Sequence, residues 1–417
     1  MTDESWLIKT LKQLNLTDSM EQKEGFSRLS YSEEEWKSIA VFQEKAEEIG
    51  LDVRRDEAGN CIARWNGVDD DQPAFGIGSH LDTVKNGGGY DGVAGVLCSL
   101  AAVKALKEEE FQPNSPIEVI CFASEESSRF GVSTVGSKAM SGLLEQQQLE
   151  QIEDDDGITI KEAVESRGLS WDQLPRAERK KEELRQFVEL HIEQGTRIED
   201  AGKSFGVATA IACPTRLKID IIGKSSHTGT TPMAKRQDAL VVAAPIISFI
   251  SERAGQLSEE NEVPVVATTS MADVFPNKMT SIPGRVELGV DIRSVSDALK
   301  RGLAEEIEKE LEKLAEAYQV DITPSRLVDD NSVFLDEKVA ETLKETGEQL
   351  GFGCLVMESG AGHDVMNMAS RWPTGLIFIP CRDGLSHHPD ESASEKDLEI
   401  GVDIIKQYLK NETKIPS

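Results

Sequence analysis

The sequence predicts an α/β protein with two domains: a main domain whose mixed sheet carries helices on both faces, and an inserted ferredoxin-like α+β domain. Three observations support this prediction. The chain has 417 residues, which is more than one ordinary hydrophobic core organises. Short apolar runs typical of buried strands alternate with helical patterns in the first and last parts of the chain. In the middle part, apolar residues alternate with polar ones, as in half-exposed antiparallel strands.

The first part of the chain is expected to begin with helix and to continue with strands. Residues 1–50 place apolar side chains at helical spacing, and Gly50 ends this pattern. The residues that follow predict a hairpin over 51–65 with its turn at 57–60, buried strands over 74–77, 116–123 and 187–190, and a buried helix over 93–106. The polar and charged residues 144–186 predict loops and short helices on a solvated rim.

The middle part predicts the element order β-α-β-β-α-β, which is that of a ferredoxin-like unit. Its predicted elements are strands around 217–221, 264–270 and 286–292 and helices over 238–253 and 295–318. One face of such a sheet stays free, which suits dimer formation. The first pattern then returns, with helices over 339–350 and 395–409 and strands over 354–358 and 376–379. We therefore expect a main domain of residues 1–213 and 328–417, and an inserted dimerisation or lid domain of residues 214–327.

The composition argues against several classes of partner. A formal net charge of −30 opposes long-range attraction to nucleic acid or to an anionic membrane surface. No apolar run approaches the roughly 20 residues that span a bilayer, and the N-terminal residues lack the layout of a secretory signal. The six cysteines are scattered through apolar runs without CxxC spacing, which indicates buried thiols in a reducing compartment, so we expect a cytoplasmic protein.

The stretch Gly78–Gly95 concentrates ligand-type residues among glycines. It holds His80, Asp82 and Asp91 between a predicted buried strand and a predicted helix. Ligand sites in open α/β sheets form at the carboxyl ends of strands, which is where this arrangement places His80. The alternative is a glycine-rich turn with a solvated aspartate and an unrelated histidine.

Further acids and histidines follow other predicted strands. Glu125 and Glu126 follow one strand, His191 follows another, and His387 lies in a connection near the C-terminus. Imidazoles and carboxylates without thiolates are typical of a hydrolytic metal site rather than a structural one. Two cations about 3.5–4 Å apart need a bridging ligand, and Asp91 with its two oxygens suits that role. Because adjacent residues point in different directions, one carboxylate of the glutamate pair can bind metal while the other accepts a proton; the alternative is a solvated turn.

Seven such motifs occur in one order along the whole chain: HLDTV-x-NGG-x-YDG-x-x-GV, EE-x-SRFG, ELHIEQG, SHTGTTPM-x-x-R-x-DA, PN…IPG…DIRS, SGAGHD and GLSHHP-x-E. Together they resemble the dinuclear metal amidohydrolases that include allantoate amidohydrolase, N-carbamoyl-L-amino acid hydrolase and β-ureidopropionase, within the wider zinc aminoacylase and carboxypeptidase-G-like superfamily. The resemblance implies two divalent metal ions per subunit, zinc or else manganese or cobalt, with Asp91 as the bridge. The implied metal ligands are His80, Asp91, Glu126, His191 and His387. It also implies that Asp82 orients His80 and that Glu125 is the general base.

The same resemblance assigns substrate-binding positions to Gln194, Arg216, His227, Asn277, Arg293, Gly360 and His363. His227 is also expected to assist catalysis by donating a hydrogen bond to the oxyanion of a tetrahedral intermediate. In relatives, the positions of His227 and Asn277 can reach the active site of the other subunit. Alternatives stay open for three residues: a surface ion pair with Asp291 or another acid for Arg293, and a satisfied loop histidine for His227 and for His363.

The resulting hypothesis is a homodimeric, two-metal hydrolase of a small linear C–N amide, such as an N-carbamoyl-L-amino acid or allantoate. Ser127 and Thr280 stand where relatives usually have glycine and a second asparagine, which leaves the exact substrate open. A second hypothesis is a deformylase or deacylase of an N-formyl or N-acyl amine, such as a formylaminopyrimidine in thiamin salvage. A third is a catalytically silent dimeric binding module.

Overall fold

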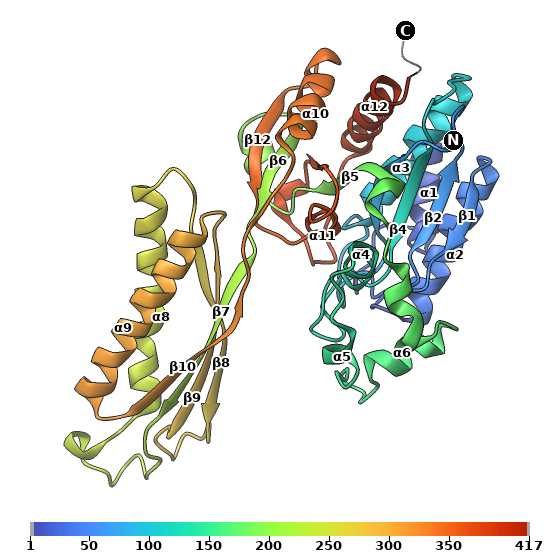
Figure 1. Ribbon diagram of the computed structural model, residues 1–417. Helices are drawn as coiled ribbons and strands as arrows, with labels where there is room; N and C mark the ends of the chain where they lie inside the picture. Colours follow the sequence, from blue (N-terminus) through green and yellow to red (C-terminus); the bar gives the residue numbers. More distant parts are fainter. Residues whose placement is uncertain (1–3, 415–417) are drawn as a thin grey trace. The chain divides into compact units, whose positions relative to one another are not determined.

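The computed structural model describes residues 4–414 and divides into two compact units (Figure 1). The first unit contains the described residues up to Thr209, the segment Phe334–Ser359 and the described residues from His363 onward. The second unit contains Ala210–Val333 and Gly360–Gly362. The second unit is therefore inserted in the sequence of the first, in the region where the sequence predicts a separate domain.

A mixed sheet of nine strands forms the centre of the first unit. Its strands are β1 (Asp52–Arg55), β2 (Cys61–Trp65), β3 (Ala74–His80), β4 (Ile117–Phe122), β5 (Leu184–Ile192), β6 (Phe205–Ile211), β11 (Val333–Phe334), β12 (Cys354–Ser359) and β13 (Thr374–Ile379). The order across the sheet is β1-β2-β4-β3-β5-β13-β6-β11, and β12 also pairs with β6. Neighbours from β4 to β13 are parallel, whereas β1 with β2, β2 with β4 and β13 with β6 are antiparallel. The predicted mixed sheet is thus confirmed.

Helices cover both faces of this sheet. The helices of the first unit are α1 (Trp6–Leu14), α2 (Glu33–Glu48), α3 (Val93–Glu108), α4 (Val135–Ser141), α5 (Gln146–Leu149), α6 (Ile160–Ser166), α7 (Arg197–Asp200), α10 (Glu337–Gln349), α11 (Asp364–Met368) and α12 (Glu395–Glu412). On one face, Leu190 of β5 shares a core with Leu97 of α3 and Ile404 of α12. Because side chains alternate along a strand, Glu189 faces the other side, where it accepts a hydrogen bond from Val365 N of α11.

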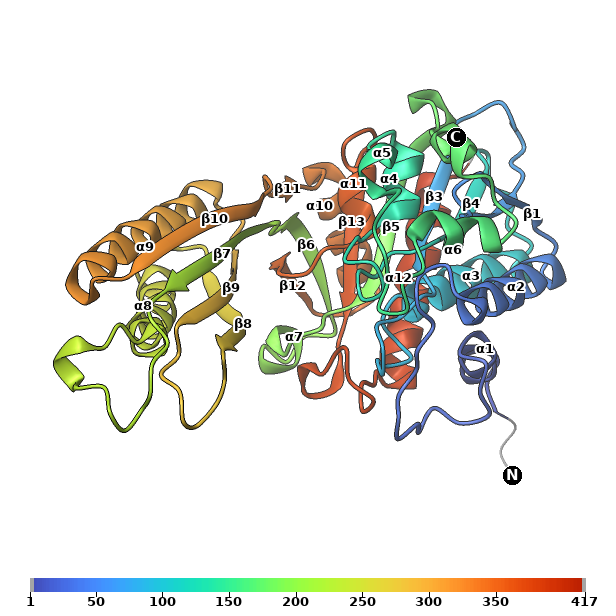
Figure 2. The ribbon, with the colours of Figure 1, turned by 90° about the horizontal axis from the view of Figure 1, so that it is seen from below.

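The second unit is a four-stranded antiparallel sheet with two long helices on one face (Figures 1 and 2). In chain order its elements are β7 (Pro214–Ile222), α8 (Ala239–Glu260), β8 (Val266–Phe275), β9 (Arg285–Arg293), α9 (Asp297–Tyr318) and β10 (Asp321–Asp329). The order across the sheet is β10-β7-β9-β8, with every neighbouring pair antiparallel. The alternating buried positions of β7 and β9 carry mainly isoleucine, leucine and valine, and these side chains share one core with both helices. The predicted β-α-β-β-α-β order is present.

From the sequence we expect no apolar run long enough to span a bilayer, but helix α8 meets that criterion. It is long and apolar enough to cross a bilayer by length and composition, with a mean hydropathy of 1.3 in its apolar window. Its buried residues recur at intervals of three or four: Ala239, Val242, Ala243, Ile246, Ile250, Ala254 and Leu257. They pack in the core of the second unit, so α8 is an amphipathic helix covering a sheet.

The N-terminal part also differs from its prediction. Residues 15–32 are not helical, although the sequence predicts helix over 1–50, of which residues 1–3 lie outside the described part. Leu16 and Tyr31 adopt positive φ angles of 56° and 54°, which a helix excludes. Ser32 starts α2 by accepting a hydrogen bond from Glu35 N. The six cysteines are free, and all except Cys354 are buried, as predicted.

Candidate metal centre

Two parallel strands bring two of the predicted ligands to one edge of the sheet. His80 is the last residue of β3, and His191 lies one residue before the end of β5. In β3, Phe75 and Ile77 pack in the same core as Leu190. The alternation of side chains therefore turns His80 to the face on which His191 lies. This edge, at the carboxyl ends of the strands, is the one at which the sequence predicts a site.

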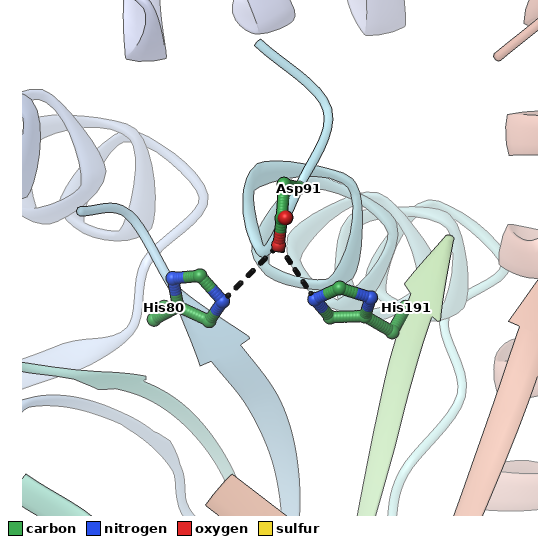
Figure 3. A group of neighbouring side chains, drawn as sticks. All are labelled: His80, Asp91 and His191. Carbon is green, nitrogen blue, oxygen red and sulfur yellow. Dashed lines mark ion pairs between the residues drawn. The ribbon is translucent and has the colours of Figure 1, made fainter. Parts of the chain in front are cut away.

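Asp91 reaches this edge from the loop before α3. Gly92 follows it with a φ of 66°, and a Cβ atom built there would lie 2.4 Å from Cε1 of His80, so only glycine fits. The Oδ1 atom of Asp91 lies 2.9 Å from Nε2 of His191 and 3.5 Å from Nε2 of His80 (Figure 3). The three side chains point toward one another and are buried. We call His80, Asp91 and His191 the strand group.

A second group shares Asp91. Its other oxygen, Oδ2, lies 3.2 Å from Nε2 of His387, which is itself 3.5 Å from Oε1 of Glu126. Asp91 and Glu126 are buried, whereas the His387 side chain is 51% exposed. We call Asp91, Glu126 and His387 the loop group, because His387 lies in the connection after β13. Each group offers three donor atoms within 4.8 Å of one another, and Asp91 presents one oxygen to each.

Nδ1 of each of the two buried imidazoles donates a hydrogen bond, which leaves the lone pair of each ring on Nε2. Nδ1 of His80 lies 3.0 Å from the backbone oxygen of Asp82, and Nδ1 of His191 lies 2.9 Å from that of Ile192. Because a carbonyl oxygen only accepts, Nδ1 carries the hydrogen in both rings. Gly92 N also donates to Nε2 of His191 at 3.2 Å. Two nitrogen lone pairs then face a carboxylate, an arrangement that a bound cation satisfies. The donor set therefore fits a divalent metal such as zinc, manganese or cobalt.

The electrostatics of the groups favour positive charge. Burial alone would raise the pKa of Asp91, but the facing imidazoles, His191 foremost, hold that pKa well below its ordinary value. The hydrogen bond to Asp91 raises the pKa of His387 to about 9. Both shifts come from the attraction between the Asp91 carboxylate and the imidazoles around it, so Asp91 stays ionised and its surroundings favour a positive charge.

Glu125 is buried beside the two groups and belongs to neither. Its Oε2 atom lies 3.9 Å from Nε2 of His80. Burial raises the pKa of Glu125 well above its ordinary value, opposed by His80 and aided by Glu126. A carboxylate with a raised pKa holds a proton more readily than an ordinary glutamate, which suits a group that takes up a proton and passes it on.

Asp82 contacts more than the imidazole that the sequence assigns to it. Its carboxylate lies 3.3 Å from Nδ1 of His80, but its backbone oxygen is closer to that nitrogen, at 3.0 Å. The two carboxylate oxygens accept the backbone N–H groups of Glu125 at 3.0 Å and of Glu126 at 2.9 Å. Ser30 Oγ donates to the same carboxylate at 3.0 Å. Asp82 therefore fixes the backbone of the glutamate pair as well as His80.

Three further residues at this site were missed in the sequence. Ser30 supports Asp82, and Glu35 accepts Ser124 N at 2.9 Å just before the glutamate pair. Glu391 accepts backbone N–H groups from both the Asp91 and the His387 loops. Ser30 lies in a polar loop, and Glu35 lies at the charged start of α2. No sequence pattern distinguishes either residue from its neighbours. Glu391 is the last residue of the GLSHHP-x-E motif, and this position could have identified it as a site residue.

Two predicted substrate contacts lie against the groups. Gln194 Nε2 donates to Oδ2 of Asp91 at 2.8 Å and to Ser386 Oγ at 3.1 Å, while its buried Oε1 has no hydrogen-bond partner in the described part of the chain. The ring of His363 packs edge-on against His191 with centroids 4.5 Å apart. Burial, followed by the neighbouring His191, lowers the pKa of His363 well below its ordinary value. Its Nε2 lies 3.0 Å from Ser359 Oγ, so His363 is a neutral, partnered imidazole.

The other predicted substrate contacts lie in the second unit. His227 and Asn277 are exposed on neighbouring loops, joined by a bridge between His227 and Ser281. Gly229 N donates to Nδ1 of His227 at 3.0 Å, so the hydrogen of a neutral ring sits on Nε2. Because the second unit is described by itself, the structure places His227 and Asn277 relative to each other and not relative to the metal centre.

Two arginines of the second unit, Arg216 and Arg293, share one carboxylate. Asp291 accepts Arg293 Nε at 2.8 Å and Arg216 Nε at 2.9 Å. Arg293 Nη1 also donates to the backbone oxygen of Gly360 at 2.6 Å. The ion pair with Asp291, held open as an alternative for Arg293, is thus formed. It also orients both guanidinium groups, which is compatible with substrate binding.

Comparisons with known proteins identify the family of the chain. Residues 76–411 match the model of the peptidase family M20/M25/M40. The chain is 36% identical to an N-carbamoyl-L-amino acid amidohydrolase of Geobacillus stearothermophilus, over 91% of this chain and 92% of the relative. It is 34% identical to the allantoate amidohydrolase of Escherichia coli, over 92% of each chain. A hydantoinase/carbamoylase family amidase from Burkholderia multivorans has a similar structure, with a TM-score of 0.86 at 28% identity over 99% of this chain and 97% of that chain. The recognition made from the motifs is confirmed, and the chain belongs to the peptidase family M20/M25/M40.

Proposed function

We propose that this protein is a metal-dependent hydrolase of a linear, non-peptide C–N amide, acting on an N-carbamoyl-L-amino acid or an allantoate-like ureido compound. One observation carries the proposal. Asp91 presents its two oxygens to two separate donor groups, while the buried Glu125 belongs to neither. A bridging carboxylate beside an unligated carboxylate is the arrangement that two-metal hydrolysis requires. The similar proteins named above support the substrate class.

Metal ions held by the strand group and the loop group would supply Lewis acidity and lower the pKa of bound water. Glu125 would take the proton of the attacking water and then give it to the leaving nitrogen. Its raised pKa favours the proton-transfer role, because the carboxyl group holds a proton more readily between the two steps. Asp82 keeps Glu125 in place through the backbone N–H group. Gln194 and His363, next to Asp91 and His191, would contact the substrate.

The second unit would supply the remaining substrate contacts. Arg293, Arg216 and the backbone of Gly360 would bind the substrate carboxylate region, with Asp291 orienting the arginines. Because the Nε2–H of His227 points away from its own loop contact, it can donate to an oxyanion. Asn277 lies on the neighbouring loop.

The protein would act as a cytoplasmic homodimer, with His227 and Asn277 completing the site of the other subunit. Leu240, Val241 and Ile247 of α8 are exposed apolar side chains that a dimer interface would cover.

The test is an activity panel with the metal-depleted protein reloaded with zinc, manganese or cobalt. The substrates are N-carbamoyl-L-amino acids, their D-enantiomers, allantoate, N-formyl amines and N-acyl amines, with release of ammonia or amine as the readout. We expect the reloaded protein to hydrolyse ureido compounds at least 100-fold more efficiently than N-acyl amines. Preferential cleavage of N-formyl amines would favour the deformylase hypothesis. A fully loaded protein without turnover on any member would favour the silent binding module.

A further inference from the structure

The buried carboxylate of Glu391 joins the loops that carry two ligands about 300 residues apart in the sequence. Its Oε1 atom accepts the backbone N–H groups of Tyr90 and Asp91, both at 2.9 Å. Its Oε2 atom accepts Ser386 Oγ at 3.0 Å and the backbone N–H group of His387 at 3.3 Å. Glu391 is only 4% exposed, so these bonds replace water.

The chain makes room for this carboxylate. A Cβ atom built on Gly88 would lie 2.2 Å from the Glu391 carboxyl group, so a larger residue would displace it. Ser386 links Glu391 to the side chain of Asp91, because its hydroxyl also lies 3.1 Å from Oδ2 of Asp91. The bridging ligand and the loop ligand are therefore held by one network centred on Glu391.

The two donor groups depend on this network to different degrees. His80 and His191 of the strand group are held within strands β3 and β5 and by their own hydrogen bonds. His387 has no strand or helix of its own and adopts a left-handed backbone with φ of 56°, which is unfavourable for a residue with a Cβ atom. Its bond to Glu391 therefore supports a strained position.

We propose that Glu391 is a positioning residue that sets the metal affinity of the loop group and couples it to the bridging aspartate. The inference rests on the proposed two-metal function. Partners behind the ligands commonly change metal affinity by about 10- to 100-fold when they are removed. Because the two histidines of the strand group have their own support and share only Asp91 with this network, removal of Glu391 weakens the loop group more than the strand group.

The experiment compares Glu391→Gln with wild type and with Asp390→Asn, a matched change at the exposed neighbouring acid. Metal-depleted proteins are titrated with Zn²⁺ by calorimetry and with Co²⁺ by absorption spectroscopy, and the melting temperature of each metal-free protein is recorded. Wild type and Asp390→Asn are expected to bind two ions per chain. Glu391→Gln is expected to bind the second ion at least 10-fold more weakly, with a much smaller loss of affinity for the first.

Three results distinguish the outcomes. Two unchanged sites in Glu391→Gln would overturn the inference. Equal weakening of both sites would also overturn it, because that result marks a purely structural role. A wild-type chain that binds fewer than two ions would instead contradict the proposed function. If Glu391→Gln does not fold, Ser386→Ala removes the hydroxyl that lies within hydrogen-bond distance of both Glu391 and Asp91, and unchanged second-site affinity in that variant would overturn the inference.

Discussion

The carboxylate of Asp82 accepts the backbone N–H group of Glu125 at 3.0 Å. The second carboxylate oxygen of Asp82 accepts the backbone N–H group of Glu126 at 2.9 Å. One buried side chain thus fixes the backbone of the proposed base, Glu125, and of a proposed ligand, Glu126. The same residue contacts His80. The geometry of the base and of both metal groups thus depends on a residue that, in our proposal, binds no metal.

Replacing Asp82 by asparagine should lower kcat by about 10- to 100-fold. The new amide nitrogen would face a backbone N–H group and leave one of the two glutamates without an acceptor. The measurement is kcat and metal content for Asp82→Asn and for Ser30→Ala, which removes a single bond to the same carboxylate. Ser30→Ala should have the smaller effect. Wild-type kcat in Asp82→Asn would contradict the positioning role.

Replacing Glu125 by glutamine should leave both metal ions bound and lower kcat by about 100- to 10,000-fold. Glutamine keeps the shape of the side chain but cannot accept a proton. Glu126→Gln is the matched comparison, because Glu126 belongs to the loop group and its loss should lower metal content and activity together. Near-full activity of Glu125→Gln would exclude its role as the base.

Replacing Gly92 by alanine should abolish binding at the strand group. The new Cβ atom would meet the ring of His80 at 2.4 Å, in addition to the strain of the positive φ. Gly131→Ala is the control, because its φ of 69° is similar but no atom lies within 4 Å of the new Cβ. The control should lose about 1 kcal/mol of unfolding free energy and keep both metal ions. Equal metal content in the two variants, measured by elemental analysis, would show that the close approach at Gly92 is unimportant.

Replacing Arg293 by alanine should lower kcat/KM for ureido acids by about 10- to 100-fold, because a charge-assisted hydrogen bond to the substrate carboxylate is lost. N-formyl amines without a carboxylate should be affected much less. Arg285→Ala, at the other end of β9, serves as the control and should leave both substrates unaffected. Equal losses on both substrate types would contradict carboxylate recognition by Arg293.

Much of the fold could be predicted from local patterns. The hairpin β1–β2, the buried strands β3, β4 and β5 and the alternation of β7 and β9 follow directly from apolar periodicity and turn residues. The region 15–32 was predicted wrongly because the helical spacing of residues 36–49 was extended over the whole of 1–50, whereas Leu16 and Tyr31 adopt positive φ. Strand β6 was missed because its small residues show no clear period.

The composition of the candidate site was easier to predict than its connections. Histidines and acids after strands point to an edge of a sheet, and the structure places His80, Asp91 and His191 together there. The contacts of Asp82 and Glu391 could not be predicted, because both bind backbone N–H groups of residues far away in the sequence. Every residue except proline carries a backbone N–H group, so the type of residue that donates to Asp82 or Glu391 cannot be recognised in the sequence.

The most direct test of the account is the position of the metal ions in crystals of the zinc-loaded protein, measured by anomalous diffraction at the zinc edge. We expect two peaks per chain on either side of Asp91, about 3.5–4 Å apart, one next to His80 and His191 and the other next to Glu126 and His387. A single peak, or a second peak that does not contact His387, would contradict the two-metal centre.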